Sequence, residues 1–256
     1  MIIKTGTEIK IMQEGGKKLS HVKNSLEKAV KEGISAMEIE NLANDLMAKE
    51  GGKPSFKMVD GYRWATCVNV NNGVVHGIPK KSIIFKRGDL VSIDVGMFYK
   101  GFHTDTSFSV GVSTGVKTNK FIETGKIALK KAISEAKVGK RIWDISNAIE
   151  TTLNKAGYSP IRSLVGHGVG RELHEDPQIP CFVDSLKRNE SPIIPEGAVL
   201  AIEVMYTKGG SNVSLSDDGW TINTADGKIA GLFEETVAIT KKGSIVLTEL
   251  DSGLTN

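Results

Sequence analysis

Residues 90–112 read LVSIDVGMFYKGFHTDTSFSVGV, and this stretch decides how the chain can fold. Its apolar start predicts a buried strand, residues 99–101 predict a turn, and the alternating pattern over 103–112 predicts a second strand. Each strand carries an acid, Asp94 in the first and Asp105 in the second. An ionised carboxylate on a buried strand is costly unless it is paired or bound to a cation.

A second pair of acids lies in similar surroundings late in the chain. Glu203 interrupts the apolar run AVLAIEVMY, and Glu234 begins EETVAIT. These segments predict strands over 197–206 and 228–240. Because side chains alternate along a strand, Asp105 shares a face with Ser107 and Ser109, and Glu234 shares a face with Thr236 and Ala238.

Acids on predicted strands have two explanations. A buried ion pair with Lys or Arg would explain any single one of them. However, few basic residues lie near these acids in the sequence, and four converging carboxylates would repel one another and resist ionisation. A pair of divalent cations is the simpler explanation for the whole set.

A fifth ligand candidate, His167, lies in GHGVGRELHEDP at 166–177. The three glycines around it permit close backbone approach. The run has neither the GxGxxG spacing of a dinucleotide site nor the HExxH spacing of a zinc protease helix. A structural histidine is the alternative, but beside four carboxylates we expect a metal ligand.

Oxygen ligands with a single imidazole suit Mn, Fe(II), Co or Zn rather than a thiolate zinc site. Two such ions would activate a water molecule and polarise a carbonyl, which is hydrolase chemistry. His76 in VVHGIP and His174 could then hydrogen-bond a substrate carbonyl or a developing oxyanion. The alternative for each is a surface or structural histidine, which is how we interpret His21 and His103. We expect Cys67 to pack as a small apolar side chain.

The remaining pattern repeats once along the chain, as two helices followed by a group of strands. This indicates two similar halves in one domain over 1–256, of the α+β class. Four helices are expected: residues 7–32, a helix that starts at a capping box at Ser35 and runs to about Glu50, residues 119–136 and residues 144–156. Further strands are expected over 161–170 and 219–224. A turn is expected at Asn71-Asn72-Gly73 and a hairpin turn at Asp226-Gly227.

The composition excludes several classes of protein. Of 256 residues, 39% are hydrophobic and 25% charged, which excludes wholesale disorder. The net charge of +3 is too small to indicate a nucleic-acid partner. No apolar run approaches the roughly 18 residues of a membrane span, and no signal peptide is visible. With two cysteines and no heptad pattern, we expect a soluble, monomeric, cytoplasmic protein without a membrane partner.

Together these motifs resemble type I methionine aminopeptidase, of the pita-bread metallopeptidase superfamily. The resemblance runs from IKTGTEIKIMQEGG near the N-terminus to EETVAIT, almost the whole chain. Its blocks are VVHGIP, IDV with GFHTDT, GHGVGRELHEDP, AIEV and FEET. The resemblance implies a pita-bread fold: two pseudo-symmetric halves with a curved, mainly antiparallel sheet, covered by helices, and a metal site at the centre.

The resemblance also implies a role for each site residue. The ligands of two divalent ions would be Asp94, Asp105, His167, Glu203 and Glu234. Asp105 and Glu234 would bridge both ions, and Glu203 would also move the proton of the attacking water. His76 would contact the substrate near the scissile amide, and His174 would stabilise the tetrahedral intermediate.

The family's methionine pocket maps onto Tyr62, Cys67 and Trp220, with Phe56 and Leu173 nearby. The chain differs from many relatives in its loop 58–66, MVDGYRWAT, and at Leu173, where many carry an aromatic residue. The implied function is removal of the initiator methionine, by a metal-activated water attacking the first peptide bond. The implied partners are nascent N-termini with a small second residue, and the ribosome is a further candidate.

Two other functions fit parts of the pattern. Xaa-Pro aminopeptidases and creatine-hydrolysing relatives resemble longer chains with an extra N-terminal domain, for which a first helix at about residue 7 leaves no room. Type II methionine enzymes carry a large insert between the ligand histidine and the next glutamate, which here lie 36 residues apart.

A non-catalytic pita-bread protein that binds ribosomes or RNA would have lost ligands, whereas all five candidates are present.

Overall fold

The acid-bearing segments form the central strands of one sheet. The computed structural model describes residues 1–183 and 187–249. Its helices are α1 (Gly6–Ala29), α2 (Ala36–Lys49), α3 (Val116–Glu135) and α4 (Ile142–Lys155), with short 3-10 turns at Phe56–Met58 and Arg188–Glu190. Its strands are β1 (Lys53–Pro54), β2 (Thr66–Val70), β3 (Gly73–Val75), β4 (Leu90–Tyr99), β5 (Phe102–Gly111), β6 (Ser159–Pro160), β7 (Val165–Gly168), β8 (Glu175–Pro180), β9 (Val199–Thr207), β10 (Val213–Leu215), β11 (Ile222–Thr224), β12 (Ala230–Thr240) and β13 (Gly243–Val246).

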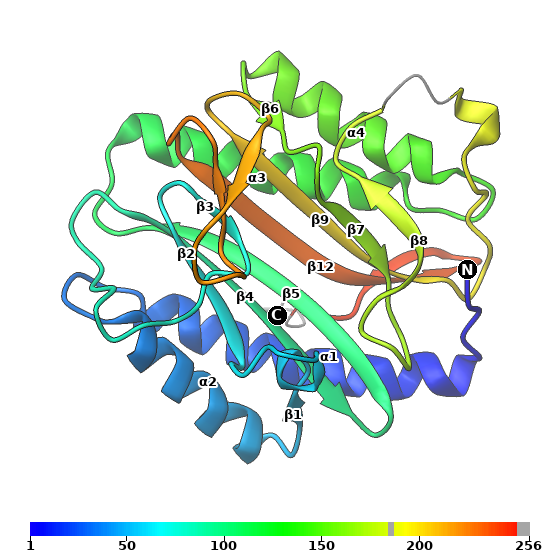
Figure 1. The fold of residues 1–256 in the computed structure, drawn as a ribbon. Coiled ribbons are helices and arrows are strands. Elements are labelled where there is room, and N and C mark those ends of the chain that lie inside the picture. The colour runs from blue at the N-terminus through cyan, green and yellow to red at the C-terminus, as the bar shows by residue number, and fades with distance from the viewer. Residues whose placement is uncertain (184–186, 250–256) are drawn as a thin grey trace, which may run out of the picture.

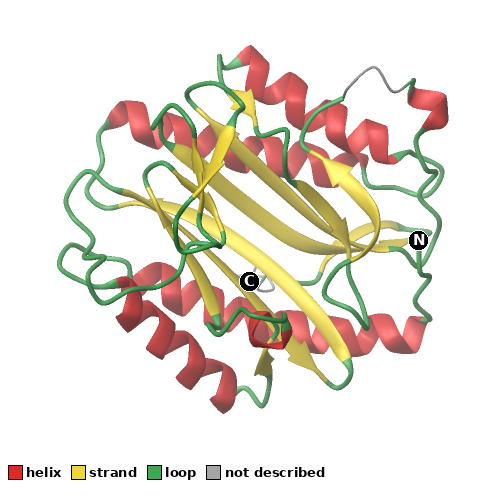
Figure 2. Cartoon of the chain, viewed as in Figure 1, coloured by secondary structure: helices red, strands yellow, loops and turns green. Residues whose placement is uncertain are grey.

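The main sheet follows the order β1-β4-β5-β12-β9-β7-β8. Strands β2, β6 and β13 extend it by pairing with β4, β9 and β12. Its strand pairs are antiparallel, as predicted. The long strands curve together through the middle of the molecule, and a small sheet of β10, β11 and β3 crosses one end of them (Figures 1 and 2).

The helices pack in pairs on the two halves of the sheet (Figure 1). Val22 of α1 and Ile39 of α2 lie in one apolar core with Ile93 of β4. Ile145 of α4 lies in a second core with Ile202 of β9. The same arrangement of two helices on long antiparallel strands therefore occurs twice, which confirms the predicted pair of similar halves.

The capping box predicted at Ser35 is confirmed, and the structure shows a second one at Thr5 that the sequence analysis did not identify. Thr5 and Ser35 each accept a hydrogen bond from the backbone three residues later, which anchors α1 and α2. The predicted end of α1 at residue 32 is wrong, because Val30 already leaves the helical conformation. The chain turns there so that Gly33, with a φ of +87°, can donate its N–H to the carbonyl of Phe85 at 2.9 Å.

Three predictions about the strands need correction. Asp226-Gly227 does not form a hairpin turn, because β11 pairs with β10 and β3 instead of β12. The strand expected over 161–170 is shorter, since only Val165–Gly168 pairs with β9 and β8. Strand β8 itself was missed, because the sequence after His174 alternates charged residues with prolines. The turn at Asn71-Asn72-Gly73 lies as predicted between β2 and β3.

Two further expectations concern cysteines and membranes. Cys67 and Cys181 are buried free thiols, so Cys67 packs as expected for a small apolar residue. Among residues 1–183 and 187–249, no helix has the length and apolar character needed to cross a membrane.

A buried carboxylate on α2 holds the segment that leads into β2. Glu40 accepts hydrogen bonds from the backbone N–H groups of Ala65 at 2.8 Å and Thr66 at 3.0 Å. It also accepts one from the Thr66 hydroxyl at 2.8 Å. Through these hydrogen bonds, the carboxylate fixes the end of the loop 58–66 against the helix.

Glu40→Gln should lower the free energy of unfolding by about 2 kcal/mol or more, because an amide cannot accept from all of these buried donors. Urea unfolding followed by circular dichroism measures the change. The matched control is Asp45→Asn on the exposed side of α2, which should change the free energy by less than about 0.5 kcal/mol. Equal effects of the two substitutions would show that these hydrogen bonds do not hold the loop.

Candidate metal centre

The five predicted metal ligands come from five neighbouring strands and line one cavity of about 150 Å³. In sheet order the strands are β4, β5, β12, β9 and β7, carrying Asp94, Asp105, Glu234, Glu203 and His167. Asp105, Glu234 and His167 are buried, whereas Asp94 and Glu203 are half-buried and face the cavity from its two sides.

Strand register explains why residues so far apart in sequence meet. Asp94 lies opposite Ser107, Ser107 lies opposite Glu234, and Glu234 lies opposite Glu203, so these side chains form one row across four strands. His167 lies opposite Ala201, two residues from Glu203 and on the same face. A slip of one residue in any strand would turn its ligand to the other face of the sheet.

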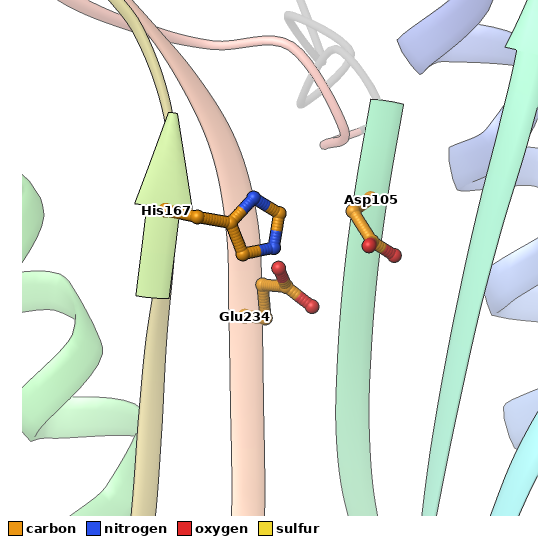
Figure 3. Close-up of side chains that lie close together, drawn as sticks. All are labelled: Asp105, His167 and Glu234. Atoms are coloured by element: carbon orange, nitrogen blue, oxygen red, sulfur yellow. The ribbon is translucent and has the colours of Figure 1, made fainter. Parts of the chain in front are cut away.

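The three central ligands converge most tightly. Ligand atoms of Asp105, His167 and Glu234 all lie within 4.8 Å of one another. Figure 3 shows the two carboxylates and the imidazole pointing toward a common space between β5, β12 and β7. These atoms are close enough to share one cation.

Hydrogen bonds fix the orientation of two of these ligands. The Thr236 hydroxyl accepts from the N–H of Asp105 at 2.9 Å and donates to the Asp105 carbonyl at 2.8 Å. His167 Nδ1 donates to the Gly168 carbonyl at 2.9 Å, because a carbonyl oxygen can only accept. This contact leaves His167 Nε2 as the ring atom available for a metal.

The carboxylates lack the cationic partners that a buried ion pair would supply. Within the described residues, no Lys or Arg lies within 4.0 Å of Asp94, Asp105, Glu203 or Glu234. Asp94 Oδ1 is buried without a hydrogen-bond partner in this part of the chain. The ion-pair explanation applies instead to the neighbouring residue Glu235, which faces the other side of β12 and pairs with Lys23 at 2.5 Å.

The pKa values of these four acids follow from burial and mutual repulsion. Burial raises the pKa of Asp105 to about 7. Burial, together with the charge of Asp105, raises the pKa of Glu203 to about 8. The same two causes raise the pKa values of Asp94 and Glu234 well above their usual range. Burial lowers the pKa of His167 to about 4, so its imidazole is neutral near pH 7. This donor set fits a divalent cation, which would replace protons at the acids.

His76 and His174, the two histidines predicted to meet the substrate, both line the cavity. The His174 ring packs edge-on against that of His167, with 4.5 Å between their centroids. His76 has a left-handed backbone, with a φ of +57°, and Gly77 after it donates its N–H to Asn69 Oδ1 at 2.9 Å. Burial lowers the pKa values of both histidines, which favours the neutral imidazole.

The two histidines that we interpreted as structural lie outside the cavity lining. His103 is buried on β5, with Nδ1 2.9 Å from the hydroxyl of Ser55. His21 lies on the exposed side of α1, with Nδ1 3.3 Å from Glu50. Neither ring lines the cavity.

An apolar pocket opens beside the acids. Tyr62 and Trp220 meet edge-to-face with 5.0 Å between ring centroids, and Cys67 lies 3.3 Å from the Tyr62 hydroxyl. That hydroxyl donates to the Thr66 carbonyl at 3.0 Å, which connects the ring to the loop held by Glu40. The other apolar lining residues are Phe56, Val59, Val75 and Leu173. Val59 was not singled out from the sequence, because nothing in the loop distinguishes it from its neighbours.

Comparison with known proteins agrees with this geometry. Residues 10–241 match metallopeptidase family M24. The chain is 40% identical over 251 residues to methionine aminopeptidase 1 of Bacillus subtilis, covering 98% of this chain and 100% of that protein. The chain belongs to the methionine aminopeptidases of metallopeptidase family M24. The crystal structure of methionine aminopeptidase from Thermotoga maritima matches with a TM-score of 0.94 and 39% identity, covering 97% of this chain and 99% of that one.

The fold is shared more widely than the methionine aminopeptidases. The prolidase from Pyrococcus furiosus matches with a TM-score of 0.77 and 25% identity, covering 98% of this chain but 66% of that one. These neighbours confirm the predicted pita-bread fold. Family membership and the clustered ligand atoms together support binding of divalent metal by this chain.

Metal should stabilise the protein more at pH 8 than at pH 6. The acids have raised pKa values in the folded metal-free protein, so it holds protons that the unfolded chain releases between about pH 4 and pH 8. The metal-free protein therefore loses stability as pH rises through this window, and a cation has fewer protons to displace at its upper end. At saturating Mn(II), differential scanning fluorimetry should record a rise in Tm of about 5 °C or more at pH 8.

The same titration at pH 6 should give a smaller rise in Tm. Asp105→Asn is the control, and it should reduce the rise at both pH values because one shared ligand is lost. A rise of equal size at pH 6 and pH 8 would contradict the proton competition.

Proposed function

We propose that this chain removes the initiator methionine from nascent proteins and peptides by metal-assisted hydrolysis of the first peptide bond. One observation carries this proposal: an apolar pocket of Tyr62, Cys67 and Trp220 opens directly onto acids that have no cationic partner in the described chain. A side chain of methionine's size and polarity suits such a pocket. Membership of the methionine aminopeptidases supports the same reaction.

Two divalent ions, drawn from Co, Mn, Fe or Zn, would occupy the acidic end of the cavity. Their ligands would be Asp94, Asp105, His167, Glu203 and Glu234. The two ligands on the central strands, Asp105 and Glu234, would be shared between both ions. Such ions, when bound, lower the pKa of water and polarise a carbonyl.

Glu203 is suited to move protons during hydrolysis. It is half-buried and lines the cavity beside the other ligand candidates, where a carboxylate can accept a proton from a water molecule bound in the same space. We assign it the proton of the attacking water, which it would pass to the departing amine. His76 and His174 would act as neutral hydrogen-bonding groups, His76 at the scissile amide and His174 at the developing oxyanion.

The shape of the site explains why a single residue would be removed. The methionine side chain would lie among Tyr62, Cys67 and Trp220, and the free N-terminal amine would face the acids. A chain extended beyond that amine would meet the acidic strands, so an internal peptide bond could not reach the same position. The partners we propose are cytoplasmic nascent chains with a small second residue, met by a monomeric enzyme at the ribosome without membrane or specific nucleic-acid contacts.

Purified protein with Mn(II) or Co(II) should release free methionine from a Met-Ala-Ser tripeptide. Chromatographic detection of methionine measures the reaction, and Asp105→Asn should abolish it if the activity belongs to this site. Absence of methionine with every metal tried would contradict the proposal. Release from Xaa-Pro peptides but not from Met-Ala-Ser would favour the prolidase-like alternative.

A further inference from the structure

His174 enters the cavity from a connection that has no regular structure of its own. Residues 169–174, called here the His174 loop, join β7 to β8 and reach toward the start of α1 (Figure 1). Three backbone hydrogen bonds shape the loop: Val169 N–H donates to the Val199 carbonyl at 3.1 Å, His103 N–H donates to the Gly170 carbonyl at 2.7 Å, and Gly170 N–H donates to the Glu172 carbonyl at 3.0 Å. These bonds do not involve Leu173 or His174, whose positions depend on other contacts.

Those contacts come from the carboxylate that directly follows His174. The Glu175 side chain is buried, with 2% of its surface exposed. Its Oε1 accepts from the N–H of Arg171 at 2.9 Å and from the N–H of Glu172 at 3.4 Å. The carboxylate therefore folds the chain back on itself over residues 171–175, the segment that contains His174.

Lys4 supplies the counter-charge for this carboxylate. Its ammonium group forms an ion pair with Glu175 Oε2 and is itself 97% covered, since its side chain is 3% exposed. The partners lie 171 residues apart in the sequence. A side chain at Gly170 would collide with the Lys4 stem, so the lysine packs directly against the loop backbone.

Lys4 is held in turn by the core of the molecule. Its N–H donates to the Gly197 carbonyl at 2.8 Å, just before β9, and Thr5 after it caps α1. The lysine therefore connects the loop to the start of a long helix and to the strand that carries Glu203. Such an anchor restricts the loop more than a flexible surface lysine would.

A second ion pair on the same loop offers a natural comparison. Arg171 pairs with Glu8 of α1 at 2.9 Å, but its side chain is 65% exposed. An exposed pair contributes about 0–1 kcal/mol. Loss of one partner from a buried pair leaves an unpaired charge in the interior, which is far more costly.

We propose that Lys4 is a positioning residue for the reaction, acting through Glu175 to fix His174 in the lining of the cavity. This inference rests on the proposed function. Without the ammonium group, the Glu175 carboxylate would have to reach water, and it could do so only if the loop moved. Because Glu175 is covalently joined to His174, the imidazole would move with it.

The first variant to test is Lys4→Met, which keeps the length of the stem and removes only the charge. With Met-Ala-Ser as substrate, we expect kcat to fall by about tenfold or more, since small displacements of a catalytic group can cost up to about a hundredfold. KM and bound metal, measured by elemental analysis, should stay within about twofold, because the methionine pocket and the ligands are not touched. The matched control Arg171→Met should leave kcat within about twofold.

The double variant with Lys4→Met and His174→Ala distinguishes a positioning role of Lys4 from a loss of activity that does not involve His174. If Lys4 acts through His174, Lys4→Met should lower kcat by less than about twofold further in that background. Equal losses with and without His174, or full activity of Lys4→Met, would overturn the proposal. If Lys4→Met does not fold, the same test uses Lys4→Gln, whose amide can still donate a hydrogen bond to Glu175. Its kcat should fall by about threefold or more. A wild-type protein that releases no methionine would instead refute the proposed function.

Discussion

Four carboxylates converge on one cavity, no lysine or arginine of residues 1–183 and 187–249 lies within 4.0 Å of them, and the rest of the site depends on this constraint. Other buried acids of the chain are compensated individually: Glu235 by Lys23, Glu175 by Lys4, and Glu40 by backbone N–H groups. In the cavity, burial and then the charges of the neighbouring acids raise the pKa values of Asp94 and Glu234, so these groups favour a bound proton or a bound cation. A divalent cation bound at the centre of the sheet would relieve the repulsion among these carboxylates.

The register of the paired strands sets the positions of the four acids, whereas the two cavity histidines, His76 and His174, lie on irregular segments. Antiparallel pairing of β4, β5, β12 and β9 aligns the acids in rows, and the helices pack against the sheet through two apolar cores. His76 and His174 lie instead on irregular segments whose positions need separate support. Asn69 bonds the backbone beside His76, and Glu175 closes the loop beside His174. The carboxylates therefore depend on strand pairing for their positions, and the two histidines depend on side chains that bond the irregular backbone beside them.

Much of this site could be read from the sequence because its signals are local. Asp94 and Glu203 interrupt apolar strands, and alternation placed Thr236 on the same face as Glu234. The start of α2 at Ser35 follows from a short capping motif, whereas the equivalent motif at Thr5 was overlooked. By contrast, the ion pair of Lys4 with Glu175 and the hydrogen bonds of Glu40 with Thr66 join segments that are distant in the sequence. No local pattern could predict them. The Asp226-Gly227 turn was misread for a related reason, since its strand pairs with β10 and β3, whose proximity depends on the tertiary fold.

The central claim is that these acids hold divalent cations and not a buried side-chain cation. Crystals grown with Mn(II), measured at the manganese absorption edge, test this claim most directly. The account predicts an anomalous peak in the space bounded by Asp105, His167 and Glu234, where the ligand atoms lie within 4.8 Å of one another. A cavity without such a peak, in which a lysine or arginine side chain contacts the carboxylates instead, would contradict it.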